Sequence, residues 1–333
     1  MSTSEREITF GEAVREAIAE EMRRDETVFF MGEDVAAAGG VFKVTAGLID
    51  EFGPDRIRDT PISEAGIMGA GVGAALTGMR PIVEIMFGDF ITIAMDQVVN
   101  QAAKLCYMTG GQTSVPLTIR TTIGAGRSSA AQHSQSLQAW MAHIPGIKVL
   151  IPSTPADLKG LLKSAIRDKN PVIIYEDKMM YSVKGMVPEG VDHTVPIGIA
   201  DIKREGSDVT IVATSSMVQV ALNAADTLTE QDDINVEVVD PRTLSPLDTD
   251  TILNSVRKTG RAVVIDEGHR SYGVTAEIAS LIGDEVFDYL DAPVKRLGAM
   301  DVPVPFSPSL EPSTIPDEAA VVKTVQSLYR DVD

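Results

Sequence analysis

A glutamate at the predicted start of a helix is the first residue whose type and position could do chemistry. Glu64 directly follows the sequence Asp-Thr-Pro-Ile-Ser, residues 59–63. Pro61 biases Thr60 towards extended backbone, and Ser63 can cap the helix that Glu64 opens. The simpler interpretation is that Glu64 only complements the helix dipole, an effect worth under about 1 kcal/mol at exposed sites.

A histidine in a predicted loop is the second such residue. His133 lies in Ala-Gln-His-Ser-Gln-Ser, residues 131–136, after the flexible glycine- and serine-rich segment 124–129. A loop of this composition after a strand commonly presents reactive groups, so His133 is a candidate proton donor. A structural histidine held by its Ser and Gln neighbours is the alternative. His269 follows a predicted strand where it turns into a loop, so we expect it to face a cleft.

The helix that Glu64 opens is rich in small residues. Residues 67–78 contain several glycines, each costing roughly 1 kcal/mol relative to alanine, so another element must approach this helix closely. Gly69, Gly71 and Gly73 do not have the G-x-G-x-x-G spacing. The chain also has no G-x-x-x-x-G-K-[ST] loop, so it contains no recognisable diphosphate cradle.

Short apolar runs alternate with helical patterns, which indicates α/β structure with mostly parallel strands. Thr9 and Glu12 predict a capping box at the start of the first helix. The predicted strands of the first half are residues 28–32, 82–85, 117–119, 148–151 and 172–175, and its helices include 10–23, 96–107 and 156–167.

The pattern breaks once, which predicts two domains. Residues 181–205 are interrupted by Gly, Pro and charged residues, and alternation then resumes from residue 209. We expect a first domain over 1–183, a linker over 184–205 and a smaller domain over 206–333. The tail, residues 302–308, is too rich in proline for a helix or a central strand and is expected to lie across a surface.

Composition excludes several classes of protein. The 333 residues are 44% hydrophobic and 23% charged, with a formal net charge of −19, which argues against nucleic-acid or anionic-membrane partners. Cys106 is the only cysteine, so there is no intrachain disulfide and no cysteine-rich metal site. The polar N-terminus lacks a signal peptide's apolar region, and no apolar run approaches 18 residues. A cytoplasmic location is expected.

Several motifs in order resemble a known family. They are residues 32–35 (GEDV), 59–64 (DTPISE), 131–136 (AQHSQS), 143–149 (HIPGIKV) and 240–248 (DPRTLSPLD). Together they resemble the β subunit of thiamine-diphosphate-dependent 2-oxo acid dehydrogenases over essentially the whole chain. The resemblance implies two doubly wound α/β domains, a transketolase-like pyrimidine-binding domain followed by a transketolase C-terminal domain.

The resemblance also implies roles for individual residues. Glu64 matches the glutamate that hydrogen-bonds the pyrimidine ring of thiamine diphosphate, a role that requires burial to oppose the helix dipole. Phe87 resembles the aromatic residue stacked on that ring, and Phe90 is the alternative. His133 matches the histidine near the substrate that stabilises or protonates intermediates and meets the incoming lipoyl group. Magnesium and the diphosphate belong to a separate α subunit with a GDG motif, which this chain lacks.

The loop after the helix 156–167 resembles a structural potassium site. The implied ligands are Ala165, Ile166, Asp168 and Asn170, with Leu117 from a neighbouring strand. Oxygen ligands suit a hard cation, and the alternative is an ordinary Asx turn before Pro171.

The implied assembly is an α₂β₂ heterotetramer that works with a lipoyl acyltransferase. It would decarboxylate a small-molecule 2-oxo acid, with pyruvate favoured, and acylate a lipoyl group. Residues 178–188 and 302–308 also look like the acetoin dehydrogenase branch, so acetoin stays open, and branched-chain 2-oxo acids are less favoured. An assembly module without catalytic activity is the alternative from a different class of protein.

Overall fold

The computed structural model describes residues 5–189 and 192–330, in two compact units. The first unit comprises Met1–Ile123 with Trp140–Ile197, and the second comprises Gly124–Ala139 with Gly198–Asp333. The segment 124–139, which carries His133, therefore belongs to the second unit, although the expected first domain included it. No helix of the described residues is long and apolar enough to cross a membrane.

The first unit is built on a parallel sheet in the order β6-β7-β5-β4-β2-β3. Every residue of β5 and β7 is buried, as expected for a parallel sheet covered on both faces. The predicted apolar runs are confirmed as strands, and β3 is a further strand that the apolar pattern did not predict. These strands are β2 (Val28–Gly32), β3 (Ile57–Asp59), β4 (Arg80–Ile85), β5 (Thr118–Ile123), β6 (Lys148–Leu150) and β7 (Val172–Asp177).

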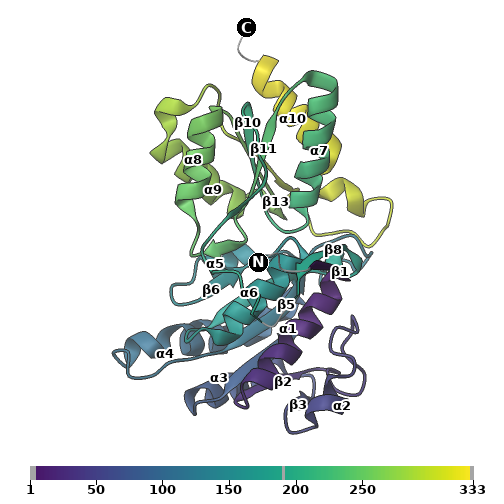
Figure 1. The fold of residues 1–333 in the computed structure, drawn as a ribbon, viewed down its shortest axis with the longest axis vertical. Coiled ribbons are helices and arrows are strands. Elements are labelled where there is room, and N and C mark those ends of the chain that lie inside the picture. The colour runs from purple at the N-terminus through teal and green to yellow at the C-terminus, as the bar shows by residue number, and fades with distance from the viewer. Residues whose placement is uncertain (1–4, 190–191, 331–333) are drawn as a thin grey trace. The chain divides into compact units, whose positions relative to one another are not determined.

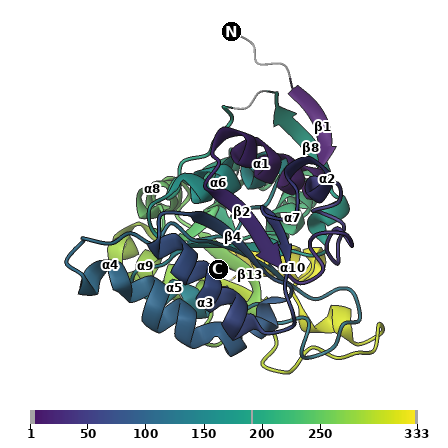
Figure 2. The same ribbon diagram turned by 90° about the horizontal axis from the view of Figure 1, so that it is seen from below.

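Helices cover both faces of this sheet. Figure 2 shows α1 (Phe10–Arg24) and α6 (Pro155–Arg167) side by side on one face of β2 and β4, and α3 (Glu64–Leu76) on the other face. The remaining helical segments that begin or lie in this unit are α2 (Leu48–Phe52), η1 (Gly88–Ala94), η2 (Asp96–Ala102), α4 (Ala103–Met108), η3 (Met180–Ser182) and the last residues of α5 (Gln138–Ala142).

The expected linker contains strands. β8 (Lys184–Pro188) pairs antiparallel with β1 (Glu5–Thr9), and β9 (Asp201–Arg204) joins the sheet of the second unit. The Gly and Pro residues between them hid both strands in the sequence, because strand pairing at a sheet edge does not require apolar alternation.

The small residues of α3 allow one close approach. A Cβ at Gly71 would lie 2.6 Å from Cγ2 of Val83 on β4, so this glycine is required where the helix packs on the sheet. Gly73 has nothing within 4 Å of the same position. The prediction that another element approaches this helix is therefore confirmed at Gly71, and the element is the helix's own sheet.

The predicted capping box at the start of α1 is present. The Thr9 hydroxyl accepts a hydrogen bond from the Glu12 amide at 3.1 Å, and the Thr9 amide donates to the Glu12 carboxylate at 2.7 Å. Ser63, the expected cap of α3, makes no such side-chain bond, so that prediction is wrong.

Thr9→Ala is expected to destabilise the protein by about 1 kcal/mol, measured as a shift in the urea midpoint. Hydrogen bonds from Thr9 lower the pKa of Glu12. The stability that this carboxylate adds is therefore present above its unfolded pKa and is lost as pH falls through the folded one. Ser63→Ala is the control. Because the Ser63 side chain makes no cap hydrogen bond, this variant should not lose stability from a missing cap. An equal loss in the two variants would contradict the prediction.

The second unit has its own sheet, in the order β14-β13-β10-β11-β9, with β9 antiparallel and the other pairs parallel. In Figure 1, α7 and α10 cover one face of this sheet, and α8 and α9 cover the other. The elements are β10 (Val209–Ala213), β11 (Val236–Asp240), β12 (Thr243–Ser245), β13 (Ala262–His269), β14 (Lys295–Ala299), α7 (Met217–Asp232), α8 (Thr249–Thr259), α9 (Val274–Glu285), η4 (Phe287–Tyr289), η5 (Glu311–Thr314) and α10 (Glu318–Arg330).

Candidate functional site

Three neighbouring strands of the first unit end beside the candidate residues. β4, β2 and β3 are adjacent and parallel. Glu33 directly follows β2, Glu64 follows β3 and Phe87 follows β4. Carboxyl ends of parallel strands meet at one edge of a sheet, where α/β proteins bind their ligands. Glu64 is 5% exposed, which satisfies the burial that its expected role requires.

Glu33 is a candidate site residue that the sequence alone did not single out, because in the sequence it is only one member of a family motif. Its side chain is 7% exposed. Burial raises the pKa of Glu33, and the negative charge of Glu64 raises it further. Gly32 makes room for this arrangement, because a Cβ there would lie 3.0 Å from Cβ of Glu84. The charge of Glu64 therefore lies close enough to disfavour ionisation of Glu33.

Glu33→Gln is expected to change the pH dependence of stability. The pKa of Glu33 is raised in the folded state, so the native protein holds this proton to higher pH than the unfolded chain does. Stability is therefore lost as pH rises from the unfolded pKa through the folded pKa, and the variant removes that loss. Thermal midpoints of the wild type and the variant, measured from about pH 4 to about pH 8, cover the range in which such a carboxyl group titrates and test the expected change in slope.

Glu51→Gln is the matched control, because Arg23 lowers the pKa of that exposed carboxyl group. Its ionisation stabilises the protein as pH rises, so the slope that it removes has the opposite sign. Identical slopes in wild type and Glu33→Gln would show that Glu33 does not titrate in this way.

The two candidate aromatic residues lie together. η1 brings the ring centroids of Phe87 and Phe90 to 5.8 Å at an interplanar angle of 81°. Gly88 between them is required, since a Cβ there would lie 2.8 Å from the Thr122 carbonyl oxygen. Both rings are half-buried, so each retains accessible surface for stacking. Which of the two would stack on a pyrimidine stays a prediction.

A buried ion cluster supports this edge of the sheet. Arg120 on β5 donates to Glu84 on β4 at 2.6 Å and to Glu176 on β7 at 2.7 Å. Tyr181 donates to Glu176 at 2.7 Å, and its ring stacks on Phe42, which in turn contacts Phe87. Burial alone would lower the pKa of Arg120, but the two carboxylates outweigh burial and raise it. The cluster ties three neighbouring strands together.

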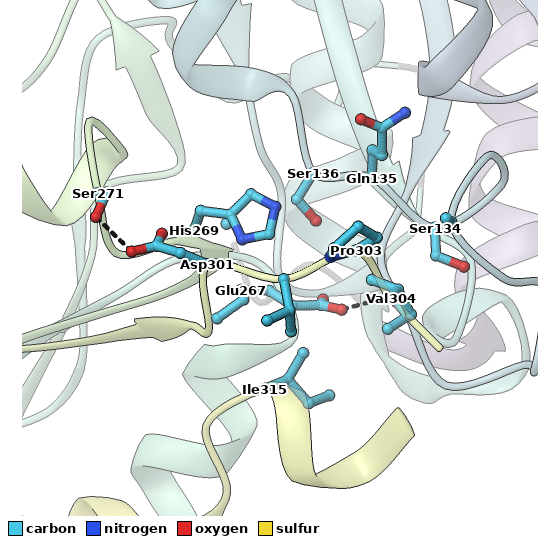
Figure 3. A pocket seen from close by; sticks show the side chains of 15 residues that line it. Ser134, Gln135, Ser136, Glu267, His269, Ser271, Asp301, Pro303, Val304 and Ile315 are labelled. Atoms are coloured by element: carbon cyan, nitrogen blue, oxygen red, sulfur yellow. Dashed lines mark hydrogen bonds between the residues drawn. The ribbon is translucent and has the colours of Figure 1, made fainter. Parts of the chain in front are cut away.

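His133 lies in the second unit, half-buried on the segment 124–139. Its neighbours Ser134, Gln135 and Ser136 line a cavity of about 490 Å³, within the range of small-molecule sites. Figure 3 shows His269 and Asp301 on the same cavity, with the Ser271 hydroxyl donating to Asp301 at 2.6 Å. The prediction that His269 faces a cleft is confirmed.

The tail also reaches this cavity. Val302, Pro303 and Val304 line it, and residues 302–308 form neither helix nor strand. Glu64, Phe87 and Phe90 thus follow neighbouring strands of the first unit, whereas His133 and His269 belong to the second unit.

The candidate potassium ligands surround the end of α6. Nη1 of Arg80 donates to the carbonyl oxygens of Ile166 and Asp168, both at 2.9 Å. The Leu117 carbonyl accepts the Val172 amide at 2.9 Å. Carbonyl oxygens have two lone pairs, so these bonds leave further acceptor capacity, and potassium binding at this loop stays a prediction.

The carboxylate of the same loop is already paired. Nζ of Lys148 lies 2.5 Å from Oδ2 of Asp168, and the Asn170 amide donates to Oδ1 in the expected Asx turn. Burial would raise the pKa of Asp168, but Lys148 and Asn170 outweigh it and lower the pKa. Among the residues that the structure describes, no group of three or more His, Cys, Asp or Glu could hold a metal ion.

Comparison with known proteins defines the class of this two-unit architecture. Residues 6–184 match the family "Transketolase, pyrimidine binding domain", and residues 198–321 match "Transketolase, C-terminal domain". A solved structure, "Split gene transketolase, inactive beta4 tetramer", matches with a TM-score of 0.77 and 26% identity over 96% of this chain and 98% of that chain. The fold is thus transketolase-like, and the expected fold class is confirmed.

More similar relatives are dehydrogenase subunits. The acetoin:2,6-dichlorophenolindophenol oxidoreductase subunit beta of Bacillus subtilis is 51% identical over 97% of each chain. The pyruvate dehydrogenase E1 component subunit beta of Rickettsia felis is 49% identical over 97% of this chain and 98% of its own. The mitochondrial E1 subunit beta-2 of Oryza sativa is 45% identical over 99% of this chain and 89% of its own.

The chain belongs to the family of pyruvate and acetoin dehydrogenase β subunits, as the sequence motifs predicted. The E1 subunits of this transketolase family imply thiamine diphosphate as the cofactor.

Proposed function

We propose that this chain is the β subunit of a thiamine-diphosphate-dependent 2-oxo acid dehydrogenase that decarboxylates pyruvate and acylates the lipoyl group of an acyltransferase. The observation that carries the proposal is that the buried Glu64 and the Phe87–Phe90 pair follow neighbouring strands of a domain that belongs to the pyrimidine-binding family. Near-half identity to pyruvate dehydrogenase β subunits over the whole chain supports it.

The described residues fit the pyrimidine end of the cofactor. A buried carboxyl group can hold a proton at a ring nitrogen, and an aromatic ring can stack on the same heterocycle. Thiamine diphosphate, when bound, supplies a stabilised carbanion for attack on a carbonyl group. In this proposal Glu64 shares a proton with the pyrimidine, Phe87 or Phe90 orients it, and His133 supplies a proton when the acyl group is transferred.

The remaining parts of the active site would come from partners. We propose an α subunit that holds magnesium and the diphosphate, in an α₂β₂ heterotetramer, because this chain has neither a GDG motif nor a phosphate loop. Its relatives are named as β subunits of an E1 component, which implies an α subunit. A cytoplasmic location is part of the same proposal.

One experiment tests the proposal. The tagged chain is purified gently from its own host, the native complex is weighed, and bound thiamine diphosphate is assayed. The purified complex is then given pyruvate, acetoin and branched-chain 2-oxo acids with a lipoyl domain. We expect a two-plus-two complex with cofactor that has its highest kcat/KM for pyruvate.

Other results would replace the proposal. Preference for acetoin would make this chain an acetoin dehydrogenase β subunit, the second candidate, which the 51% identity to the Bacillus subtilis relative favours. A homo-oligomer without cofactor would point to an assembly module without catalytic activity.

Potassium binding at the loop after α6 is part of the proposal and has its own test. Replacing Na⁺ by K⁺ at constant ionic strength is expected to stabilise the complex, by about 2.7 kcal/mol when K⁺ is 100 times its Kd, measured as a higher Tm. Asp168→Asn should reduce this response. Asp208→Asn is the control, because its carboxylate bonds the Asn235 amide in the other unit and should leave the response intact. Equal Tm values in the two salts would contradict potassium binding.

A further inference from the structure

The segment that carries His133 is held at both ends by carboxylates of the second unit. At its start, the Ala125 amide donates to Glu267 at 2.6 Å. At its end, the Gln138 side chain donates to both oxygens of Asp266, at 2.9 and 3.0 Å. Asp266 and Glu267 are consecutive residues of β13, so one strand holds both ends of the segment.

Glu311 holds the same segment through two backbone amides. One of its carboxylate oxygens accepts the Gly126 amide at 2.7 Å, and the other accepts the Ser128 amide at 2.8 Å. The side chain is 3% exposed, so these charge-assisted bonds are shielded from water. Glu311 is itself anchored, since its amide donates to the Ser307 carbonyl at 3.0 Å.

The turn that these carboxylates hold is strained. Ser128 has φ 51° and Ala130 has φ 61°, in the left-handed region that non-glycine residues rarely adopt. Such conformations persist only where surrounding contacts impose them, and they concentrate at functional sites. Ala130 is connected directly to His133, because the His133 amide donates to its carbonyl at 3.4 Å. Loss of these carboxylate hydrogen bonds would therefore let the turn relax and move His133.

We propose that Glu311 and Glu267 are positioning residues for His133, which hold the turn at residues 125–130 so that the imidazole meets the lipoyl group. This inference rests on the proposed function. In acyl transfer the lipoyl S–S bond breaks and is reduced, and one sulfur bonds to the acyl carbon. That carbon would be oxidised to a thioester as it loses its hydroxyl proton and its bond to the cofactor, which would keep the electron pair, while the other sulfur takes a proton. His133 donates that proton, so its position controls this step and no earlier one.

Two assays of the purified holo-complex separate this step from the rest. The first is reductive acylation of a lipoyl domain, and the second is substrate-dependent reduction of 2,6-dichlorophenolindophenol, which involves no lipoyl sulfur. Glu311→Gln keeps the size of the side chain but places an NH₂ group against an amide N–H. We expect kcat for acylation to fall by about 10- to 100-fold, as for a misplaced general acid, and dye reduction to change by less than about threefold.

A double-mutant cycle gives the readout that a merely structural role would not produce. His133→Ala combined with Glu311→Gln should acylate no more slowly than His133→Ala alone, because Glu311 acts through the imidazole of His133. Glu318→Gln is the matched control. Its carboxylate accepts the Thr227 hydroxyl at 2.8 Å in the same unit and does not touch the segment, so both assays should stay at wild-type values.

Each other outcome overturns the inference. Unchanged acylation, equal losses in the two assays, or losses that add to those of His133→Ala would show that Glu311 does not act through His133. If Glu311→Gln does not assemble, Glu267→Gln is used, because it removes one amide bond where Glu311→Gln affects two. Failure of both variants to assemble would mean that these carboxylates are needed to fold the second unit and do not serve specifically to position the segment that carries His133. An inactive wild type would instead refute the proposed function.

Discussion

Glu64→Ala is expected to abolish thiamine-dependent turnover, with a fall in kcat of at least about 10²- to 10⁴-fold, the usual contribution of a positioned acid or base. Glu64 is the buried carboxyl group at the strand ends where the pyrimidine would bind, and alanine cannot hold a proton there. Glu33 interacts electrostatically with Glu64, so Glu33 is the described group that could supply a replacement proton.

The measurement is single-turnover decarboxylation by the purified complex, with native mass spectrometry to show that the heterotetramer and its cofactor remain. Glu51→Ala is the matched control, because that glutamate is exposed and pairs with Arg23 far from the strand ends. Unchanged turnover in Glu64→Ala would refute the role of Glu64 and favour an assembly module. A large loss that appears also in Glu33→Gln would show that the two carboxyl groups act as one unit.

Arg120→Met is expected to have the largest effect on stability, a loss of about 3–5 kcal/mol. Arg120 is 2% exposed, and Glu176, which it bonds through two nitrogens, is fully buried. Removing the guanidinium leaves Glu84 and Glu176 without their positive partner, and a buried unpaired charge is far more costly than an exposed one. Urea unfolding of the wild type and the variant measures the loss.

Two controls separate charge burial from simple loss of contacts. Arg23→Met removes an exposed pair with Glu51 and should cost about 1 kcal/mol or less. Adding Glu84→Gln and Glu176→Gln to Arg120→Met should recover part of the stability, because no uncompensated charge remains. If the triple variant is no more stable than Arg120→Met, lost packing and not unpaired charge is the cause.

The local elements followed from the order of residue types. The apolar run at residues 28–32 became a strand with the predicted ends, and the first helix extended one residue beyond its predicted range, to Arg24. These elements depend on the period of apolar residues and on contacts within a few positions, as in the Thr9–Glu12 box. Both are present in any short stretch of sequence, so they can be read without the rest of the chain.

Features that depend on distant residues could not be read in this way. Ser63 has the right type and position for a cap but does not form one. β8, in the expected linker, pairs with β1 through residues that lie between 175 and 183 positions apart, and periodicity carries no signal for that pairing. Glu33 gained a role only when folding buried it near Glu64.

The order of the residues was thus sufficient for the α/β class, the family and the candidate residues Glu64, Phe87, Phe90 and His133, because local patterns and motifs carry them. The tertiary structure decided their surroundings. It assigned the His133 segment to the second unit through carboxylates that lie between 128 and 185 positions away. Hydrogen bonds and charge burial act through space, so their partners become known only when the chain is folded.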